Sequence, residues 1–300
     1  MATPSWLNKK EYPFKPHYFE TAVGKMHYVD EGTGDPIVFV HGNPSWSFQY
    51  RHLIKKLSKS HRCIAPDHIG FGLSDKPEDW SYLPKEHAKN LDAFLESLDL
   101  KDITIVVNDW GGPIGLSCAI KHPERIRNIV INNTWLWSVR DNWYYQAFSK
   151  FVGGPIGTFL IKKRNMFARD IVKAAFGDKK KLTEDVHRHY LMPLDDPKQR
   201  KGSWVFPWEV VNSADWLASL WKKRQVLKNK NILIAWGMKD IAFKKKELRT
   251  WAEAYPKAKV VMYANAGHYV SEEKPKEMLK EMNMLFEKKD KKNEKTSKKK

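Results

Sequence analysis

The chain has 300 residues, of which 42% are hydrophobic and 13% aromatic. This composition excludes a disordered or fibrous protein, and it suffices for two small domains or for one large domain with an insertion. The formal net charge is +18, but residues 288–300 contribute +6 through eight lysines against Asp290 and Glu294, which leaves +12 for the rest. A lysine-rich end without aromatic residues is typical of a solvated, disordered tail, with weak contact to anionic surfaces left open. We therefore expect no specific nucleic-acid partner.

Two cysteines, Cys63 and Cys118, are too few and too far apart for a disulfide framework or a metal cluster. We expect both to be reduced and buried. The first ten residues contain no apolar run of the kind found in secretory signals, and no stretch approaches membrane-spanning length. These features predict a cytoplasmic protein.

Short β-branched apolar runs alternate with amphipathic stretches along most of the chain, which predicts helices packed around a mostly parallel sheet. The expected strands are Lys25–Glu31, Pro36–His41, Arg62–Pro66, Thr104–Asn108, Ile126–Asn132, Asn231–Gly237 and Lys259–Tyr263. Helices are expected at Pro84–Ser97, Gly111–Lys121 and Lys244–Tyr255.

The alternation stops after Asn133 and resumes near Asp215, which leaves an interval rich in Trp, Phe, Lys and Arg. Amphipathic helices are expected at Trp143–Val152 and Gly157–Phe176, without a core strand between them. We predict an inserted helical cap and a divided main domain. The expected ranges are 1–135 and 209–287 for the main domain, 136–208 for the cap and 288–300 for the disordered tail.

The sequence around Asp109 combines an apolar strand, a polar residue, two glycines and a helix, in the order Ile-Val-Val-Asn-Asp-Trp-Gly-Gly-Pro-Ile-Gly from 105 to 115. This order is typical of a nucleophile elbow, in which the apical side chain stands on a strained turn. Val107 occupies a position where a glycine is usual. Taken alone, Asp109 could simply cap the following helix.

Two later residues favour a catalytic role for Asp109. Asp240 follows the expected strand Asn231–Gly237, and His268 follows the expected strand Lys259–Tyr263. Both therefore lie at carboxyl ends of strands, where open α/β sheets place their sites. The order nucleophile, acid, histidine is also the order of a catalytic triad on such a sheet.

A further segment, Val-His-Gly-Asn-Pro-Ser-Trp at 40–46, follows the expected strand Pro36–His41. The backbone N–H groups of Asn43 and Trp110 would then form an oxyanion hole. The plainer interpretation is a Gly-Asn-Pro turn without a catalytic role.

At these residues the sequence closely resembles the haloalkane dehalogenases. The likeness lies in His-Gly-Asn-Pro-Ser-Trp from 41, in residues 62–77, in Asn-Asp-Trp-Gly-Gly from 108 and in Ala-Gly-His from 266. Residues 65–77 are shared with epoxide hydrolases, so the pairing of Asn43 with Trp110 is the feature that indicates halide.

The resemblance implies an α/β-hydrolase fold, with an eight-stranded, mostly parallel sheet and a helical cap. It implies Asp109, Asp240 and His268 as the triad, with Asn43 and Trp110 as halide ligands. Some family members use a Glu after the strand that here ends at Asn133, which cannot supply a carboxylate. The sequence therefore resembles the branch that combines an Asn halide ligand with a late Asp acid.

This chemistry needs an anionic nucleophile, because Asp109 must attack an sp3 carbon while halide leaves. His268 would then activate the water that hydrolyses the alkyl ester, with Asp240 orienting the imidazole. The expected partners are a small apolar halogenated substrate, water and a chloride or bromide product. We expect no cofactor and no metal, and we treat His187 and His189 as surface residues.

Three rival functions stay open. An epoxide hydrolase would share the nucleophile and would use cap tyrosines, for which Tyr144, Tyr145 and Tyr190 are candidates. A haloacid dehalogenase would need arginines near the nucleophile, and the cap offers Arg140, Arg164 and Arg169. A ligand-binding protein that has lost catalysis is the third.

Overall fold

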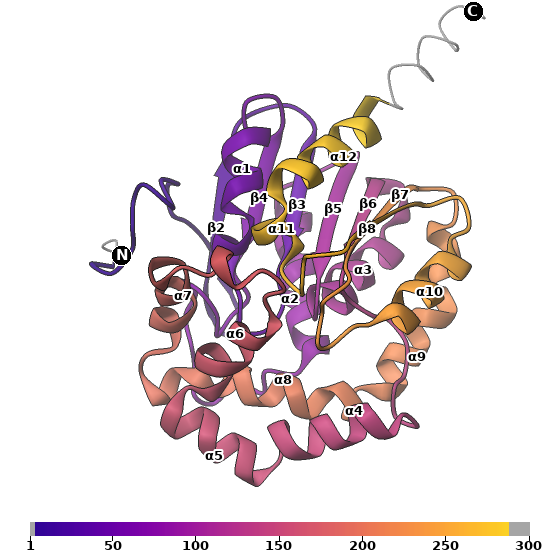
Figure 1. Ribbon diagram of the computed structural model, residues 1–300. Helices are drawn as coiled ribbons and strands as arrows, with labels where there is room; N and C mark the ends of the chain where they lie inside the picture. The colour runs from indigo at the N-terminus through magenta and orange to yellow at the C-terminus, as the bar shows by residue number, and fades with distance from the viewer. Residues whose placement is uncertain (1–3, 288–300) are drawn as a thin grey trace, which may run out of the picture.

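The computed structural model describes residues 4–287, and the predicted tail at 288–300 lies outside the described residues. Eight strands form one sheet in the order β1-β2-β4-β3-β5-β6-β7-β8, with β1 and β2 antiparallel and the others parallel (Figure 1). The strands are β1 His17–Thr21, β2 Gly24–Glu31, β3 Pro36–Val40, β4 Arg62–Pro66, β5 Ile103–Asn108, β6 Ile126–Asn132, β7 Asn231–Gly237 and β8 Lys259–Tyr263. The predicted mostly parallel sheet is confirmed, and each predicted strand is found to within one residue at either end.

The central strands are continuous apolar runs because helices cover both faces of the sheet. All six residues of β5 are buried, as are the last four of β3. The first strand, β1, was not predicted. It is a half-buried edge strand that pairs with β2 alone, so its sequence lacks the apolar run of a central strand.

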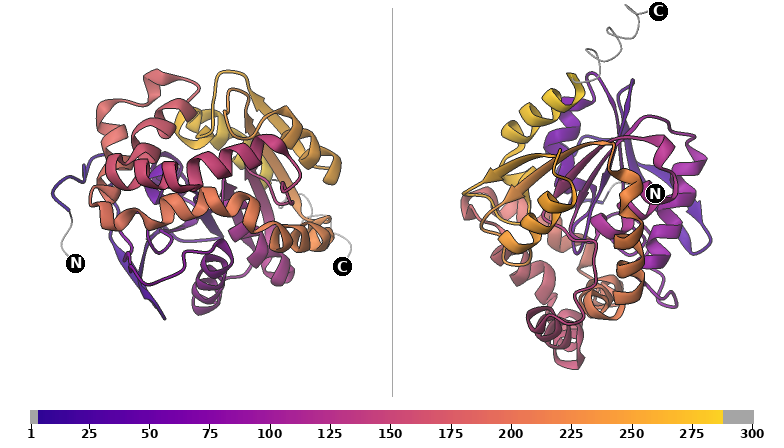
Figure 2. Two further views of the ribbon diagram at one scale, coloured as in Figure 1. Left: turned by 90° about the horizontal axis from the view of Figure 1, so that it is seen from below. Right: turned by 90° about the vertical axis from the view of Figure 1, so that its right-hand side faces the viewer.

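Helices α2, α3, α9 and α10 cover one face of the sheet, and α1, α11 and α12 cover the other (Figure 2, right). Their bounds are α1 Arg51–Leu57, α2 Pro84–Ser97, α3 Gly111–Lys121, α9 Ala214–Lys223, α10 Lys245–Ala254, α11 Val270–Glu273 and α12 Pro275–Glu287. The predictions for α2 and α3 are confirmed, and α10 is one residue shorter at each end. No helix within 4–287 is long and apolar enough to cross a membrane. Cys63 and Cys118 are free and buried, as predicted, and burial raises the pKa of the Cys63 thiol to about 12.

A further group of helices lies below the sheet in Figure 1, across the carboxyl ends of the parallel strands. They are α4 Trp143–Phe148, α5 Pro155–Arg164, α6 Val172–Ala175, α7 Glu184–Leu191 and α8 Lys201–Asn212, and a π-helical segment, Ser149–Gly153, continues α4. Residue 208 falls inside α8, so the predicted cap boundary there does not coincide with a helix end. The division into domains remains a prediction.

Two predictions for the cap are wrong. A single helix over Gly157–Phe176 is interrupted at Asn165, whose left-handed φ of 51° ends α5 and whose buried side chain donates to the carbonyl of Leu194 (3.0 Å). His187 and His189 are buried rather than on the surface. His187 bonds the Ala168 carbonyl at 2.9 Å, and His189 accepts from the N–H of Asn8 at 3.0 Å.

Candidate active site

Asp109 occupies the turn between β5 and α3, with a left-handed φ of 53°. Such a conformation costs on the order of 1–3 kcal/mol for a residue other than glycine, and it persists where the surroundings fix it. The Asp109 N–H donates to the Asn133 carbonyl (3.0 Å), and the Thr134 hydroxyl donates to the Asp109 carbonyl. A Cβ at Gly112 would lie 1.9 Å from the Thr134 hydroxyl oxygen, so any side chain here would force Thr134 or the start of α3 to shift. The predicted elbow is therefore present, with the carboxylate at its apex.

Backbone donors hold the Asp109 carboxylate. The Asn43 N–H donates to Oδ1 at 2.8 Å, and the Trp110 N–H also bonds this carboxylate. The loop after β3 comes close because Gly42 has no side chain: a Cβ there would lie 2.2 Å from Oδ1 of Asp109. His41 fixes this loop, since its Nε2 accepts from the N–H of His68 (2.9 Å). The two N–H groups expected from the sequence thus converge on one point.

The structure brings His268 and Asp240 to the same place. Nδ1 of His268 lies 2.9 Å from Oδ2 of Asp240, and its Nε2 lies 3.8 Å from Oδ2 of Asp109. The first distance is a hydrogen bond, whereas the second is too long for one. The imidazole is therefore fixed by Asp240, and the hydrogen-bonding position of Nε2 faces the space beside the Asp109 carboxylate.

Asn133 takes part in this arrangement in a way that the sequence did not indicate. Its Nδ2 donates to Oδ2 of Asp240 (2.8 Å) and to the Gly237 carbonyl (3.0 Å), and its Oδ1 accepts from the Gly237 N–H (2.7 Å). Oδ1 of Asp240 accepts from the Ala242 N–H (2.7 Å). Each oxygen of the buried Asp240 carboxylate therefore has a donor besides the imidazole. This satisfies the charge without a basic residue.

Asn108, the last residue of β5, connects the Asp109 elbow to the loop that carries His268. Its Nδ2 donates to the carbonyls of Asn133 (3.1 Å) and His268 (3.2 Å), while its Oδ1 accepts from Gln49 (2.8 Å). The His268 N–H donates to the carbonyl of Ala175 in the cap (2.9 Å). The polar sequence Asn-Asp after an apolar strand is the signal that could have indicated this residue.

Burial and the neighbouring groups act in opposite directions on the pKa values of Asp109 and His268. Burial raises the pKa of Asp109, while His268 and the N–H groups of Trp110 and Asn43 act in the opposite direction. Burial alone would lower the pKa of His268, but Asp240, through its charge and hydrogen bond, and Asp109 raise it overall. The two carboxylates therefore favour the protonated form of His268, and burial opposes it.

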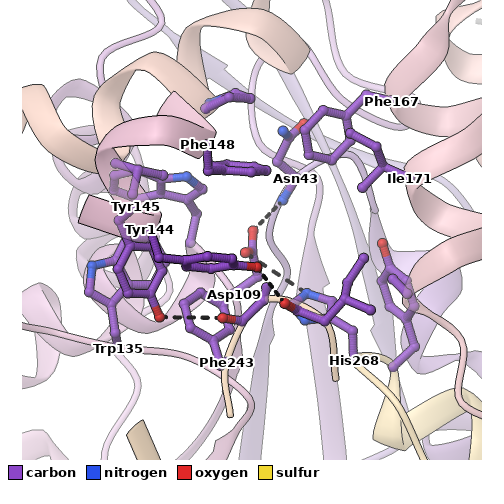
Figure 3. Close-up of a pocket in the computed structure, with 17 residues that line it drawn as sticks. Asn43, Asp109, Trp135, Tyr144, Tyr145, Phe148, Phe167, Ile171, Phe243 and His268 are labelled. Carbon is purple, nitrogen blue, oxygen red and sulfur yellow. Dashed lines mark hydrogen bonds and ion pairs between the residues drawn. The ribbon is translucent and has the colours of Figure 1, made fainter. Parts of the chain in front are cut away.

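A cavity of about 170 Å³ opens beside Asp109 and is lined mostly by apolar side chains from the sheet loops and the cap (Figure 3). In this view Asp109 lies between Asn43 and His268. The lining residues are Asn43, Asp109, Trp110, Trp135, Tyr144, Tyr145, Phe148, Phe167, Ile171, Ala175, Pro207, Val210, Ile241, Ala242, Phe243, His268 and Tyr269. All five predicted site residues except the fully enclosed Asp240 face this space. The cavity fits a small apolar substrate.

The aromatic wall was not predicted residue by residue. Trp135 packs edge-on against Trp110 (4.6 Å between ring centroids) and stacks on Phe243 (5.0 Å).

The Asn43 amide donates weakly to the Ser203 carbonyl at 3.4 Å, and its Oδ1 is buried without a partner in the described chain. The amide is therefore held by one long bond, and both candidate halide ligands border the cavity.

The cap tyrosines are engaged elsewhere. Tyr144 donates to the Ile241 carbonyl (2.8 Å) and Tyr145 to the Ala242 carbonyl (3.3 Å), although both rings line the cavity. Tyr190 donates to the buried Glu272 (2.6 Å) and does not line the cavity. Arg140, Arg164 and Arg169 do not line it either.

Asp92, Glu96 and His122 form the one group within 4–287 whose ligand atoms, all within 4.8 Å of one another, are close enough for a metal ion. The ammonium of Lys121 already contacts Asp92 and lies 3.5 Å from Glu96. None of these residues lines the cavity. This group therefore lies apart from the Asp109 cavity.

Residues 35–275 match the family model described as the alpha/beta hydrolase fold. The chain belongs to the α/β-hydrolase fold family. It is 36% identical over 266 residues to Haloalkane dehalogenase 2 of Mycobacterium tuberculosis, covering 88% of this chain and 92% of the relative. This identity places the chain in the haloalkane dehalogenase family, a group of hydrolases within that superfamily.

A second relative differs in its named reaction. The cis-3-alkyl-4-alkyloxetan-2-one decarboxylase of Shewanella oneidensis is 37% identical over 281 residues, covering 89% of this chain and 86% of the relative. Among solved structures, the haloalkane dehalogenase DatA from Agrobacterium tumefaciens C58 superposes with a TM-score of 0.82 at 24% identity, covering 91% of this chain and 96% of that one. This structural match supports the fold.

Proposed function

We propose that this protein hydrolyses small halogenated alkanes to an alcohol and a halide ion, with Asp109 as a covalent nucleophile. The observation that supports this most is the Asp109 carboxylate at the apex of a strained elbow, beside an apolar cavity and 3.8 Å from an imidazole bound to a second carboxylate. A carboxylate needs no base to become a nucleophile, which suits attack on carbon. The mostly apolar lining leaves this anion poorly hydrated and more reactive.

In the first step, an Asp109 oxygen attacks the carbon while the carbon–halogen bond breaks and halide leaves. We assign Trp110 and Asn43 as the halide ligands, through the indole N–H and the side-chain amide. Neutral donors suit a large, weakly hydrated anion, and the dry cavity strengthens their bonds to it. Both residues border the cavity next to Asp109, which supports the assignment.

In the second step, water attacks the acyl carbon of the alkyl ester, and Nε2 of His268 takes its proton. Asp240 stabilises the imidazolium that forms. The Asn43 and Trp110 N–H groups, which hold the Asp109 carboxylate at rest, stabilise the tetrahedral oxyanion. Collapse of this intermediate releases the alcohol and restores Asp109.

A panel of short brominated alkanes tests the proposal. We expect bromide and alcohol from wild type and neither product from Asp109→Ala. His268→Phe should release about one equivalent of bromide and retain an alkyl group on Asp109 by mass spectrometry. Steady turnover by the His268 variant would refute the hydrolytic step, and bromide release by the Asp109 variant would refute the nucleophile.

Decarboxylation of a four-membered lactone is a second candidate, because one relative at 37% identity has that name. Asp109 would attack the sp3 ring carbon that is bonded to the ring oxygen. The ring would open, and the carboxylate released from this carbon would face the Asn43 and Trp110 donors. Loss of CO2 would then expel Asp109 and leave an alkene, without any hydrolysis. In this reaction His268→Phe would keep turning over, and carbon dioxide rather than halide would be released.

Epoxide hydrolysis and haloacid dehalogenation have less support in the site. An epoxide hydrolase requires tyrosine hydroxyls that point at the substrate, but those of Tyr144 and Tyr145 donate to backbone carbonyls. A haloacid dehalogenase requires an arginine in the cavity, and none of the lining residues is one. An aromatic epoxide and a haloacid belong in the same assay, with no diol and no hydroxyacid expected. We also propose the cytoplasm as the compartment, since both cysteines are free thiols.

A further inference from the structure

Large apolar side chains are exposed on the outer side of the cap. Phe151, Ile156, Phe159 and Trp208 are 45–66% exposed, and we call these four residues the cap surface. Isolated exposed apolar residues are ordinary, but a contiguous group marks an interaction site. None of the four lines the catalytic cavity, so the active site does not explain their exposure.

The four side chains come from helices that pack together. The π-helical segment and α5 both pack against α8, and Figure 2 (left) looks onto these helices from below. Ile156 and Phe159 lie three residues apart on α5 and so face the same side. A Cβ at Gly153 would lie 2.4 Å from the backbone of Trp208, so the turn before α5 lies against α8. A shallow groove between them is lined by Gly153, Gly154, Pro155, Thr158, Trp204, Val205 and Trp208.

The segment 143–164, which holds three of the four cap-surface residues, carries only basic charge. Residues 143–164 contain Lys150, Lys162, Lys163 and Arg164, all exposed, and no acidic residue. A second hollow, which shares Trp204 with the groove, is lined by Lys162, Lys163, Lys198, Lys201, Pro197 and Glu78. The ammonium of Lys162 lies 4.3 Å from the centre of the Trp204 ring. An apolar groove therefore adjoins a hollow that is lined mainly by lysines.

We propose that the cap surface binds peripherally to an anionic lipid bilayer. Exposed aromatic and aliphatic side chains beside lysines suit the headgroup region of a membrane, where the apolar groups leave water while the ammonium groups stay at the polar surface. The basic residues complement the negative surface of such a bilayer. A second copy of the chain is disfavoured on this face, because pairing would bring two sets of lysines together.

This inference does not depend on the proposed function. Binding to a bilayer would give any apolar substrate a short path from the membrane to the catalytic cavity. Tyr144, Tyr145 and Phe148 of α4 line this cavity, and α4 runs directly into the π-helical segment that holds Phe151. A substrate dissolved in the bilayer would thus lie near the active site.

Co-sedimentation of the full chain with vesicles tests the proposal, using phosphatidylcholine alone and phosphatidylcholine with about one third phosphatidylglycerol. We expect binding to the anionic vesicles that weakens with salt. The double variant Ile156→Ser/Phe159→Ser should lower the partition coefficient about tenfold or more. Its control is Val260→Ser/Met262→Ser, which removes exposed apolar side chains from β8 and should leave binding unchanged.

Charge is tested separately with Lys150→Gln/Lys163→Gln, for which we expect a loss of about fivefold per lysine at low salt. The matched control is Lys222→Gln/Lys223→Gln on α9. A chain ending at residue 287 measures the contribution of the tail lysines. Cooperative denaturant unfolding of each variant, with a midpoint close to that of the wild type, checks that the fold is kept.

Three results would overturn the proposal. One is absence of binding to anionic vesicles, and another is equal loss of binding in the cap variants and their controls. The third is a wild-type dimer that the Ile156/Phe159 variant converts to a monomer, since a second copy would then be the occupant.

Discussion

Replacing Asp240 by Asn removes one charge and changes the shape of the site very little. Because Nδ2 of Asn133 and Nδ1 of His268 both face Oδ2, the amide oxygen of the variant must take that place to accept from both. The amide nitrogen then faces the Ala242 N–H, which donates to Oδ1 in the native protein (2.7 Å). The Ala242 N–H loses its acceptor and faces a second donor, the new amide, at a cost of about 1–3 kcal/mol in the free energy of unfolding for each donor left unpaired.

The effect on the reaction is larger and falls on one step. Oδ2 of Asp240 and Nδ1 of His268 are 2.9 Å apart, and the Asp240 side chain is fully buried. At an effective dielectric constant of about 20, this distance gives an attraction on the order of 5 kcal/mol between carboxylate and imidazolium. Part of it remains through the amide dipole. We therefore expect ester hydrolysis to slow about 10³-fold or more, comparable with the loss in serine-protease triads.

Rapid-quench kinetics with a brominated alkane separates the two steps of this variant. In the proposed first step Asp109 attacks as a carboxylate without help from a base, so the bromide burst should change less than tenfold while alcohol formation becomes very slow. An alkylated enzyme should accumulate and be visible by mass spectrometry. If bromide release slowed as much as alcohol formation, or if neither changed, the role assigned to Asp240 would be refuted.

Two further substitutions and one pH comparison test the same geometry. Asn43→Ala removes an amide donor and should slow the bromide burst about 10²-fold. Stopped-flow halide detection measures the burst, and an unchanged burst would exclude Asn43 as a halide ligand. Gly112→Ala should lower the free energy of unfolding by about 1–3 kcal/mol, because the added Cβ meets the Thr134 hydroxyl at 1.9 Å. Denaturant unfolding tests this against Gly115→Ala, whose Cβ meets side-chain carbons at 2.9–3.2 Å and should cost less. The raised pKa of His268 depends partly on the Asp109 charge, which the alkyl ester removes. Hydrolysis needs the neutral imidazole and is lost as the pH falls through the pKa of His268 in the ester. The pKa obtained from the pH profile of ester hydrolysis should therefore be lower than the pKa of His268 that NMR titration gives in the free protein. Equal values would show that the Asp109 charge does not act on His268.

The sheet and the meeting of three site residues could be predicted because they depend on local order. Parallel strands end at the same edge of a sheet, so the residues that follow β5, β7 and β8 lie along one edge, and the loop after β8 brings His268 back toward the end of β5. Asp109, Asp240 and His268 follow these strands. The left-handed φ of Asp109 accords with the small residues that follow it, since α3 passes close to Thr134.

Other features depend on packing between segments far apart in the chain. The bond from Asn133 to Asp240 joins residues 107 positions apart, and the sequence indicated only that Asn133 could not be the acid. The amphipathic pattern of 157–176 did not reveal the break at Asn165, because its left-handed turn is stabilised by a carbonyl from residue 194. The buried side of His189 is covered by the N-terminal segment near Asn8.

The most direct test of Asp109 as a covalent nucleophile is a single turnover in water enriched in oxygen-18, with enzyme in excess over a brominated alkane. In the proposed reaction the alcohol takes its oxygen from the Asp109 carboxylate, so the first alcohol should contain ordinary oxygen. The label should appear in the peptide that contains Asp109. Oxygen-18 in the alcohol of the first turnover, with an unlabelled Asp109, would show direct attack by water and contradict the mechanism.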